Sequence, residues 1–277
     1  MHAIQNTKHS ILFLIIPCVF ILCATIAGTA GQDPPALLFT LKQVAPNVWA
    51  AIQPQGQGNA GVVIGDDGVL VIDTFITADL SGNLSDQAAR QLLAEMRKLT
   101  PLPVKFAVNT HFHLDHVGGN NVFAGAGATL LAQRNVRNWI HTENVKMIGN
   151  TIKPEQRTFI ESLAAPSIVF DEGVDVHLGS RAIEIRSFPG HTGSDSVVVI
   201  RDAKVIFMGD FFWRNMLPNL VHASTKLWID TLNTLIKTFP DYTFVPGHGD
   251  IGTMQEVAAL RDYLMDYIGV LRGKRFP

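Results

Sequence analysis

Short apolar runs separated by turn residues cover the first half of the chain, beginning near Phe39. Runs of this length that are rich in β-branched residues and bounded by glycine or aspartate are typical of strands. Between Asp86 and Leu99 the apolar residues recur at helical spacing, and Pro101 ends the pattern, so we predict a helix there. The predicted strands are Val48–Gln53, Ala60–Ile64, Val69–Asp73 and Val104–Asn109.

The second half of the chain repeats this order of strands and helices. One helix with a single apolar face is predicted around Trp228, and a final helix follows a capping box formed by Thr253 and Glu256. The stretch Asn135–Pro166 is less regular and predicts short helical segments. The predicted strands are Ala182–Phe188, Ser196–Arg201, Val205–Met208 and Thr243–Val245. This alternation predicts layered sheets with helices outside, an α/β (α+β) fold.

Composition adds to this picture mainly by excluding other classes of protein. The 277 residues are 47% hydrophobic and 17% charged, which is typical of a globular chain and not of a disordered one. The formal net charge is -2, and lysine and arginine do not cluster. A nucleic-acid partner is therefore not expected, because such a partner requires a basic surface.

The first thirty residues follow a different pattern. Lys8 precedes the apolar run Ile11–Ile26, and small residues then continue up to Ala30. This order is typical of a secretory signal that is cleaved after a small residue. We therefore predict a signal peptide over residues 1–30 and a single domain over residues 31–277.

Cleavage would place the mature protein in the periplasm or outside the cell, without stable membrane association. An uncleaved membrane anchor is the alternative, although the run is short for a bilayer and contains Pro17. Both cysteines, Cys18 and Cys23, lie within the run. The mature protein would therefore have no disulfide and no thiolate ligand, so that any metal must be bound by histidine and aspartate.

Four potential metal ligands follow the predicted strand Val104–Asn109 within six residues: His111, His113, Asp115 and His116. Two histidines at i and i+2 on an extended segment can face one cation. The turn at Asp115 and His116 can direct those two side chains toward a neighbouring cation.

Three further potential ligands each follow a predicted strand. His191, Asp210 and His248 stand beside glycine or proline, which permits a sharp turn at the end of a strand. All seven residues are therefore expected at one edge of the sheets. Imidazole and carboxylate are the ligands that zinc prefers when thiolate is absent, so the set predicts a zinc centre.

These motifs, in this order, resemble the metallo-β-lactamase superfamily of hydrolases, and the resemblance extends from about Val44 to the final helix. It implies a four-layer αββα sandwich and two zinc ions per chain. It also implies that the first zinc is bound by His111, His113 and His191, and that the second is bound by Asp115, His116 and His248. Asp210 would bridge the two ions.

The resemblance implies hydrolysis of a small-molecule substrate. Two zinc ions lower the pKa of a shared water and polarise a carbonyl, so the nucleophile would be hydroxide. Asp115 or Asp210 would transfer the proton, and Asn219 would polarise the substrate. Asp73 would hold the ligand loop, although a turn-capping aspartate is the alternative.

The expected substrate is a cyclic amide, a lactone or a thioester, with a β-lactam as the first choice. The chain departs from the best-known zinc β-lactamases at His116, where they have arginine, and at Asp210, where they have cysteine. A bridging aspartate is instead similar to thioesterase-like, lactonase-like and phosphodiesterase-like members. Arg214 could bind an anionic group of the substrate, or it could be a solvated loop residue.

Two other functions remain open. Some proteins with a similar ligand pattern use a single iron, held by two histidines and an aspartate, to oxidise persulfides. A non-catalytic binding protein stabilised by metal is the second alternative. Of the histidines outside the motifs, His222 alone follows Asn219 on a loop that is expected to flank the cleft.

Overall fold

The computed structural model describes residues 36–54 and 56–271. The chain divides into two units, residues 1–36 and 37–277, and the following description concerns the second. The predicted signal peptide and its two cysteines lie outside the described residues, so the signal and the predicted domain division stay predictions. Among the residues described, no helix combines the length and the apolar character needed to cross a membrane.

Seven strands form the larger sheet, in the order β1-β2-β3-β4-β7-β8-β9. The strands from β1 to β4 pair antiparallel, and β4, β7, β8 and β9 pair parallel. Their bounds are Thr40–Ala45 (β1), Val48–Ile52 (β2), Ala60–Ile64 (β3), Val69–Ile72 (β4), Val104–Asn109 (β7), Thr129–Gln133 (β8) and Ile168–Phe170 (β9).

Five strands form the second sheet, in the order β10-β11-β12-β13-β14. All pairs are antiparallel except β13 and β14, which are parallel. Their bounds are Gly173–Leu178 (β10), Arg181–Ser187 (β11), Ser196–Ile200 (β12), Val205–Phe207 (β13) and Thr243–Val245 (β14). A short hairpin of β5 (Thr77–Ala78) and β6 (Leu84–Ser85) stands apart from both sheets.

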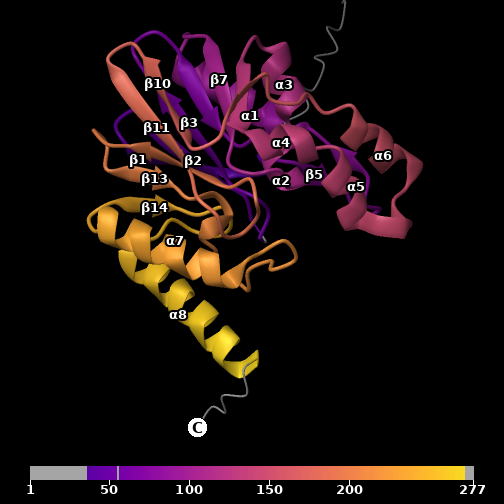
Figure 1. Ribbon diagram of the computed structural model, residues 1–277. Helices are drawn as coiled ribbons and strands as arrows, with labels where there is room; N and C mark the ends of the chain where they lie inside the picture. Colours follow the sequence, from indigo (N-terminus) through magenta and orange to yellow (C-terminus); the bar gives the residue numbers. More distant parts are fainter. Residues whose placement is uncertain (1–35, 55, 272–277) are drawn as a thin grey trace, which may run out of the picture. The chain divides into compact units, whose positions relative to one another are not determined.

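Helices cover the outer faces of the sheets. The α-helices are α1 (Gln87–Leu99), α2 (Leu114–Val117), α3 (Asn120–Gly125), α4 (Arg134–Trp139), α5 (Thr142–Ile148), α6 (Pro154–Glu161), α7 (Thr225–Thr238) and α8 (Met254–Leu271). Two short 3-10 helices are η1 (Gly149–Thr151) and η2 (Gly209–Phe211). Figure 1 shows α7 and α8 side by side near β14, and α4, α5 and α6 together beyond the larger sheet.

Both faces of the central strands are buried, which explains their continuous apolar runs. In β4, Leu70 and Ile72 join the core between the two sheets, whereas Val71 packs with α1 and α3. In β12, Val198 joins the core between the sheets, and Val199 packs with α7 and α8. The apolar layers therefore alternate as helix, sheet, sheet and helix, and the predicted αββα sandwich is confirmed.

Each predicted strand agrees with an observed strand to within one residue at either end, and α1 begins one residue after the predicted start. The predicted helical stretch is confirmed as α4, η1, α5 and α6. Six strands were not predicted: β1, β5, β6, β8, β9 and β10. β8 shows why, since the segment Thr129–Gln133 is a short apolar run that would equally fit a buried helix.

Candidate metal centre

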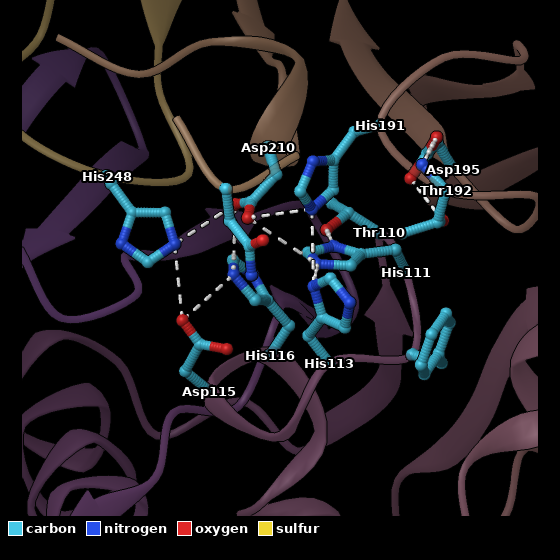
Figure 2. A network of polar contacts seen from close by, with 12 residues as sticks. Thr110, His111, His113, Asp115, His116, His191, Thr192, Asp195, Asp210 and His248 are labelled. Carbon is cyan, nitrogen blue, oxygen red and sulfur yellow. Dashed lines mark hydrogen bonds and ion pairs between the residues drawn. The ribbon is translucent and has the colours of Figure 1, made fainter. Parts of the chain in front are cut away.

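The loop after β7 carries four of the seven predicted ligands, and the segments after β11, β13 and β14 carry the others. Because β13 and β14 are parallel, Asp210 and His248 lie at the same edge of their sheet. The chain approaches itself so closely there that a Cβ on Gly247 would lie 2.1 Å from Oδ1 of Asp210. All seven residues lie together (Figure 2): His111, His113, Asp115, His116, His191, Asp210 and His248.

The first ligand group consists of His111, His113, His191 and one oxygen of Asp210. Nδ1 of His113 lies 3.0 Å from Nε2 of His111 and 3.2 Å from Nε2 of His191. Oδ2 of Asp210 lies 3.2 Å from Nε2 of His191 and 3.6 Å from Nε2 of His111. All four side chains are buried, and their ligand atoms converge on one point that a single cation could occupy.

The second ligand group consists of Asp115, His116 and His248. Oδ2 of Asp115 lies 3.2 Å from Nε2 of His248 and 3.5 Å from Nε2 of His116. Oδ1 of Asp210 lies 3.1 Å from Nε2 of His116 and 3.2 Å from Nε2 of His248. Asp210 therefore lies between the groups, with one oxygen facing each of them (Figure 2).

Several buried atoms of this centre have no hydrogen-bond partner. Among the described side chains, these include Nε2 of His116, Nε2 of His248 and Oδ1 of Asp210, which all face one another. Buried polar atoms almost always have a partner, and imidazole nitrogen and carboxylate oxygen are zinc ligands. The residues therefore fit a metal ion at the second ligand group.

Asp73 contacts His116 of the second group directly and reaches His111 of the first group through Thr110. Its Oδ2 lies 2.8 Å from Nδ1 of His116 and accepts a hydrogen bond of 2.8 Å from the Thr110 hydroxyl, while its Oδ1 accepts one of 2.7 Å from the Thr110 amide. The Thr110 hydroxyl in turn lies 3.2 Å from Nδ1 of His111. Because these contacts occupy Nδ1 of His116 and His111, Nε2 of both histidines faces the centre. A carboxylate behind a metal-binding histidine commonly orients the ring in this way. The position of Asp73 requires a positive φ of 57°, which aspartate tolerates better than most residues.

Asp195 holds the loop that carries His191. Its carboxylate accepts hydrogen bonds of 2.5 Å from both the amide and the hydroxyl of Thr192. Burial raises the pKa of Asp195 to about 6, although the charge of His191 and the two hydrogen bonds from Thr192 oppose that rise. The Asp195 carboxylate therefore supports the loop by holding Thr192, the residue that follows the ligand His191.

Burial favours neutral histidines in the first ligand group. Burial, followed by the charge of His191, lowers the pKa of His113 to about 3. Burial also lowers the pKa of His111 well below its usual 6.5. The imidazoles of His111 and His113 therefore carry free lone pairs at neutral pH, the state in which imidazole binds a metal.

Carboxylates have the opposite effect in the second ligand group. Burial opposes a charge on His248, but Asp210 and Asp115 outweigh burial and raise its pKa to about 10. The same two carboxylates, against the same effect of burial, raise the pKa of His116 well above 6.5. Before a metal binds, these two histidines therefore hold protons that the metal must displace.

Two predicted site residues have other contacts. Oδ1 of Asn219 accepts a hydrogen bond of 2.9 Å from the amide of Val221, so its carbonyl stabilises its own loop, and its catalytic role stays a prediction. The guanidinium of Arg214 lies 3.2 Å from the Glu256 carboxylate and also donates to the carbonyl of Ile251. Arg214 is therefore a partly exposed residue that pairs with Glu256, and its role toward an anionic substrate stays a prediction.

Three further aromatic residues lie at the centre, and of these only His222 was singled out from the sequence. The Trp213 ring stacks on His248 at 3.8 Å and 18°, and Trp228 lies against His191 with ring centroids 5.1 Å apart. Nδ1 of His222 lies 3.0 Å from Nε2 of His113. No spacing in the sequence connects these residues to their partners, and only the position of His222 after Asn219 hinted at its role.

The profile of the metallo-beta-lactamase superfamily matches residues 54–248. The chain belongs to this superfamily. Among known relatives, the linear primary-alkylsulfatase of a Pseudomonas species is 23% identical over 219 residues, which cover 66% of this chain and 40% of the sulfatase. The acyl-coenzyme A thioesterase MBLAC2 of Bos taurus is 27% identical over 196 residues, which cover 65% of this chain and 68% of the thioesterase.

A solved structure of a metallo-beta-lactamase from Pontibacter korlensis has the same fold. It superposes with a TM-score of 0.66 at 19% identity, covering 82% of this chain and 99% of that one. The chain thus belongs to a superfamily of metal-dependent hydrolases, and its histidine and aspartate residues form two groups that could hold a metal ion.

Proposed function

We propose that the protein is a two-zinc hydrolase of acyl compounds, with an ester or a thioester as its substrate. The observation that carries this proposal is the position of Asp210, whose two oxygens each face a different group of ligand atoms. When bound, two zinc ions would lower the pKa of a water between them and polarise the carbonyl that this water attacks.

The chain's own carboxylates divide the work of the reaction. The oxygen of water bonds to the carbonyl carbon, the bond from that carbon to oxygen or sulfur breaks, and a proton passes to the leaving group. The Asp115 side chain is 27% exposed, whereas that of Asp210 is 2% exposed and enclosed by four histidines. We therefore assign the proton transfer to Asp115 and a holding role to Asp210.

Two observations favour an acyl ester or thioester over the β-lactam that the sequence analysis preferred. First, a relative of this chain is named as an acyl-coenzyme A thioesterase, and the bridging aspartate is similar to the pattern of thioesterase-like members. Second, the Arg214 guanidinium pairs at 3.2 Å with the Glu256 carboxylate, which offsets the positive charge that would attract the carboxylate of a β-lactam.

The test is a substrate panel with the protein loaded with two equivalents of zinc. It would contain a 4-nitrophenyl ester, an acyl thioester, a lactone and a chromogenic cephalosporin. We expect turnover of the ester and the thioester, and a loss on the order of 10³-fold when Asp115 becomes asparagine. The matched control is Asp171→Asn, which removes an exposed carboxylate paired with Arg134. Cleavage of the cephalosporin alone would overturn the choice of substrate.

Metal analysis of the same protein distinguishes the other functions. We expect two zinc ions per chain. One iron per chain together with sulfite formation from a persulfide would instead establish the dioxygenase. Absence of hydrolysis across the whole panel, with zinc bound, would leave the non-catalytic binding protein.

Export is also part of this proposal, and it is supported by the sequence of residues 1–30. The expected result is a mature protein outside the cytoplasm whose first residue is Gly31. The mass of the N-terminal peptide in each cell fraction checks this prediction. An intact signal in a membrane fraction would establish the anchored form, and a full-length protein in the cytoplasm would exclude export.

A further inference from the structure

A cavity of about 320 Å³ lies beside the first ligand group. Its lining residues are Phe112, Trp139, Glu143, Gly193 and His222. The Phe112 ring contacts the His113 ring with centroids 4.7 Å apart, and His222 contacts His113 through ring nitrogens. The cavity wall is therefore continuous with a ligand of the predicted metal centre.

Two aromatic rings make the cavity apolar and rigid. Phe112 and Trp139 meet edge to face, with ring centroids 5.8 Å apart and planes at 84°. Phe112 is buried, so neighbouring residues surround its ring. A Cβ on Gly193 would lie 2.8 Å from the Trp139 ring, so glycine is what leaves room for the indole on that side. Cavities of this size with such walls bind apolar groups.

The cavity lining contains one acidic residue, Glu143, and no lysine or arginine. The Glu143 carboxylate pairs at 2.7 Å with Lys146, which does not line the cavity and whose side chain is 70% exposed. An anionic group in the cavity would meet a carboxylate and no lining cation, which is an effective means of rejecting it.

We infer that this cavity binds the acyl chain of the substrate and selects apolar, uncharged chains over chains that end in a carboxylate. The inference rests on the proposed hydrolase function. The apolar part of the chain gains from contact with Phe112 and Trp139, in proportion to the apolar area removed from water. A terminal carboxylate would lose its hydration there and face Glu143.

The test compares two esters of similar length, 4-nitrophenyl hexanoate and mono-4-nitrophenyl adipate, which differ by a terminal carboxylate. With zinc-loaded protein we expect kcat/KM for the hexanoate to exceed that for the adipate by at least about tenfold. Glu143→Lys should reduce this preference or reverse it. A wild-type protein that prefers the adipate would overturn the inference.

The chain offers a matched control for the charge change. Glu95 on α1 has a 19% exposed side chain and pairs with Lys98 three residues later, just as Glu143 is 25% exposed and pairs with Lys146. Glu95→Lys should leave the ratio of the two esters unchanged. Equal effects of the two substitutions would mean that only the overall charge matters, and would also overturn the inference.

Trp139→Ala tests the apolar wall. We expect the ratio of kcat/KM for the hexanoate to that for 4-nitrophenyl acetate to fall about tenfold, mainly through KM, at unchanged zinc content. Gly193→Ala should lower the same ratio by pressing on the Trp139 ring and is a second test if the first variant does not fold. An unchanged ratio in a folded variant would exclude the cavity as the acyl site.

A binding measurement separates this inference from the proposed function. In zinc-loaded protein labelled with ¹⁵N at the indoles, hexanamide should shift the Trp139 signal, which Trp139→Phe identifies, and Glu143→Lys should not prevent this. If no ester is hydrolysed but the signal shifts, the hydrolase proposal fails and the apolar site stands. If esters are hydrolysed and the signal does not shift, the inference fails alone.

Discussion

The two ligand groups of the metal centre differ in their readiness to bind a cation. The first has three buried histidines whose only carboxylate is the shared Asp210, and burial keeps His111 and His113 neutral. The second has Asp115 of its own, and carboxylates keep His116 and His248 protonated. The same residue type is thus prepared for metal in one group and blocked by a proton in the other. The difference arises from where the carboxylates lie.

Removal of the shared carboxylate should have the largest effect. Asp210→Asn keeps the shape of the side chain but removes the charge that faces both groups at 3.1 to 3.2 Å. We expect both ions to be lost or weakened together, and kcat/KM to fall on the order of 10³-fold. Metal analysis after dialysis checks the first part, and ester hydrolysis checks the second.

A second substitution controls for the loss of a carboxylate in Asp210→Asn. Asp171→Asn, which removes an exposed carboxylate, should retain both ions and full activity. If Asp210→Asn loses only one ion, Asp210 belongs to one group and does not bridge the two.

The pH dependence of metal binding should separate the groups most directly. Because the His248 pKa is raised to about 10 and the His116 pKa is also raised, a metal must displace their protons throughout pH 6–8. The affinity of the second group should therefore rise with pH, about tenfold per unit for each proton displaced. The His113 pKa of about 3 lies below this window and the His111 pKa is also lowered, so a metal should displace no proton from these two ligands, and the affinity of the first group should depend less on pH.

Calorimetric zinc titrations in two buffers with different ionisation enthalpies would measure the protons released by each ion. The ion in the second group should release more protons than the ion in the first group. Equal release by both ions would show that the two groups do not differ in protonation.

Asp73→Asn should weaken the second group more than the first. Asparagine tolerates the positive φ and can still accept the Thr110 amide, but it no longer holds His116 with a charge. Loss of such a supporting carboxylate typically lowers metal affinity about 10–100-fold. Competition with a chromogenic zinc chelator measures each affinity.

The control for Asp73→Asn is the same substitution at Asp66, an aspartate whose hydrogen bonds hold a turn. Asp66 accepts hydrogen bonds from the amide and hydroxyl of Ser180 and lies on the surface. Asp66→Asn should leave both metal affinities unchanged. An equal loss in both groups for Asp73→Asn would instead mean that Asp73 acts mainly through Thr110 and His111.

The smallest predicted effect concerns the two tryptophans beside the centre. Trp213 stacks on His248 in the second group, and Trp228 lies against His191 in the first. Cobalt(II) should quench Trp228 fluorescence as the first ion binds and Trp213 fluorescence as the second binds. Trp213→Phe should remove the later phase of quenching and reduce affinity for the second ion only several-fold, since such stacking contributes about 1 kcal/mol. Loss of the earlier phase would contradict the assignment.

The sequence predicted the central parts of the fold well, because burial on both faces gives central strands long apolar runs. The central strands β3 and β7 have the predicted bounds, as does β14 at the edge of its sheet. β10 was missed because its side chains alternate between exposed and buried and include His177 and Asp175, so it lacks a continuous apolar run. β1 lies at the edge of its sheet and is largely exposed, which removes the same signal.

By itself, the sequence determined which residues of the centre share a loop and which atoms they offer, because the strand before His111 and the turn after His113 limit where their side chains can point. It also determined the family through the order of those motifs. The tertiary structure decided how the ligands are divided, since Asp210 comes from another sheet and its two oxygens reach both groups. It also decided which histidines hold protons, the position of Asp73 behind His116, and the aromatic cavity beside His113. Each of these depends on distances between segments far apart along the chain, which local spacing does not specify.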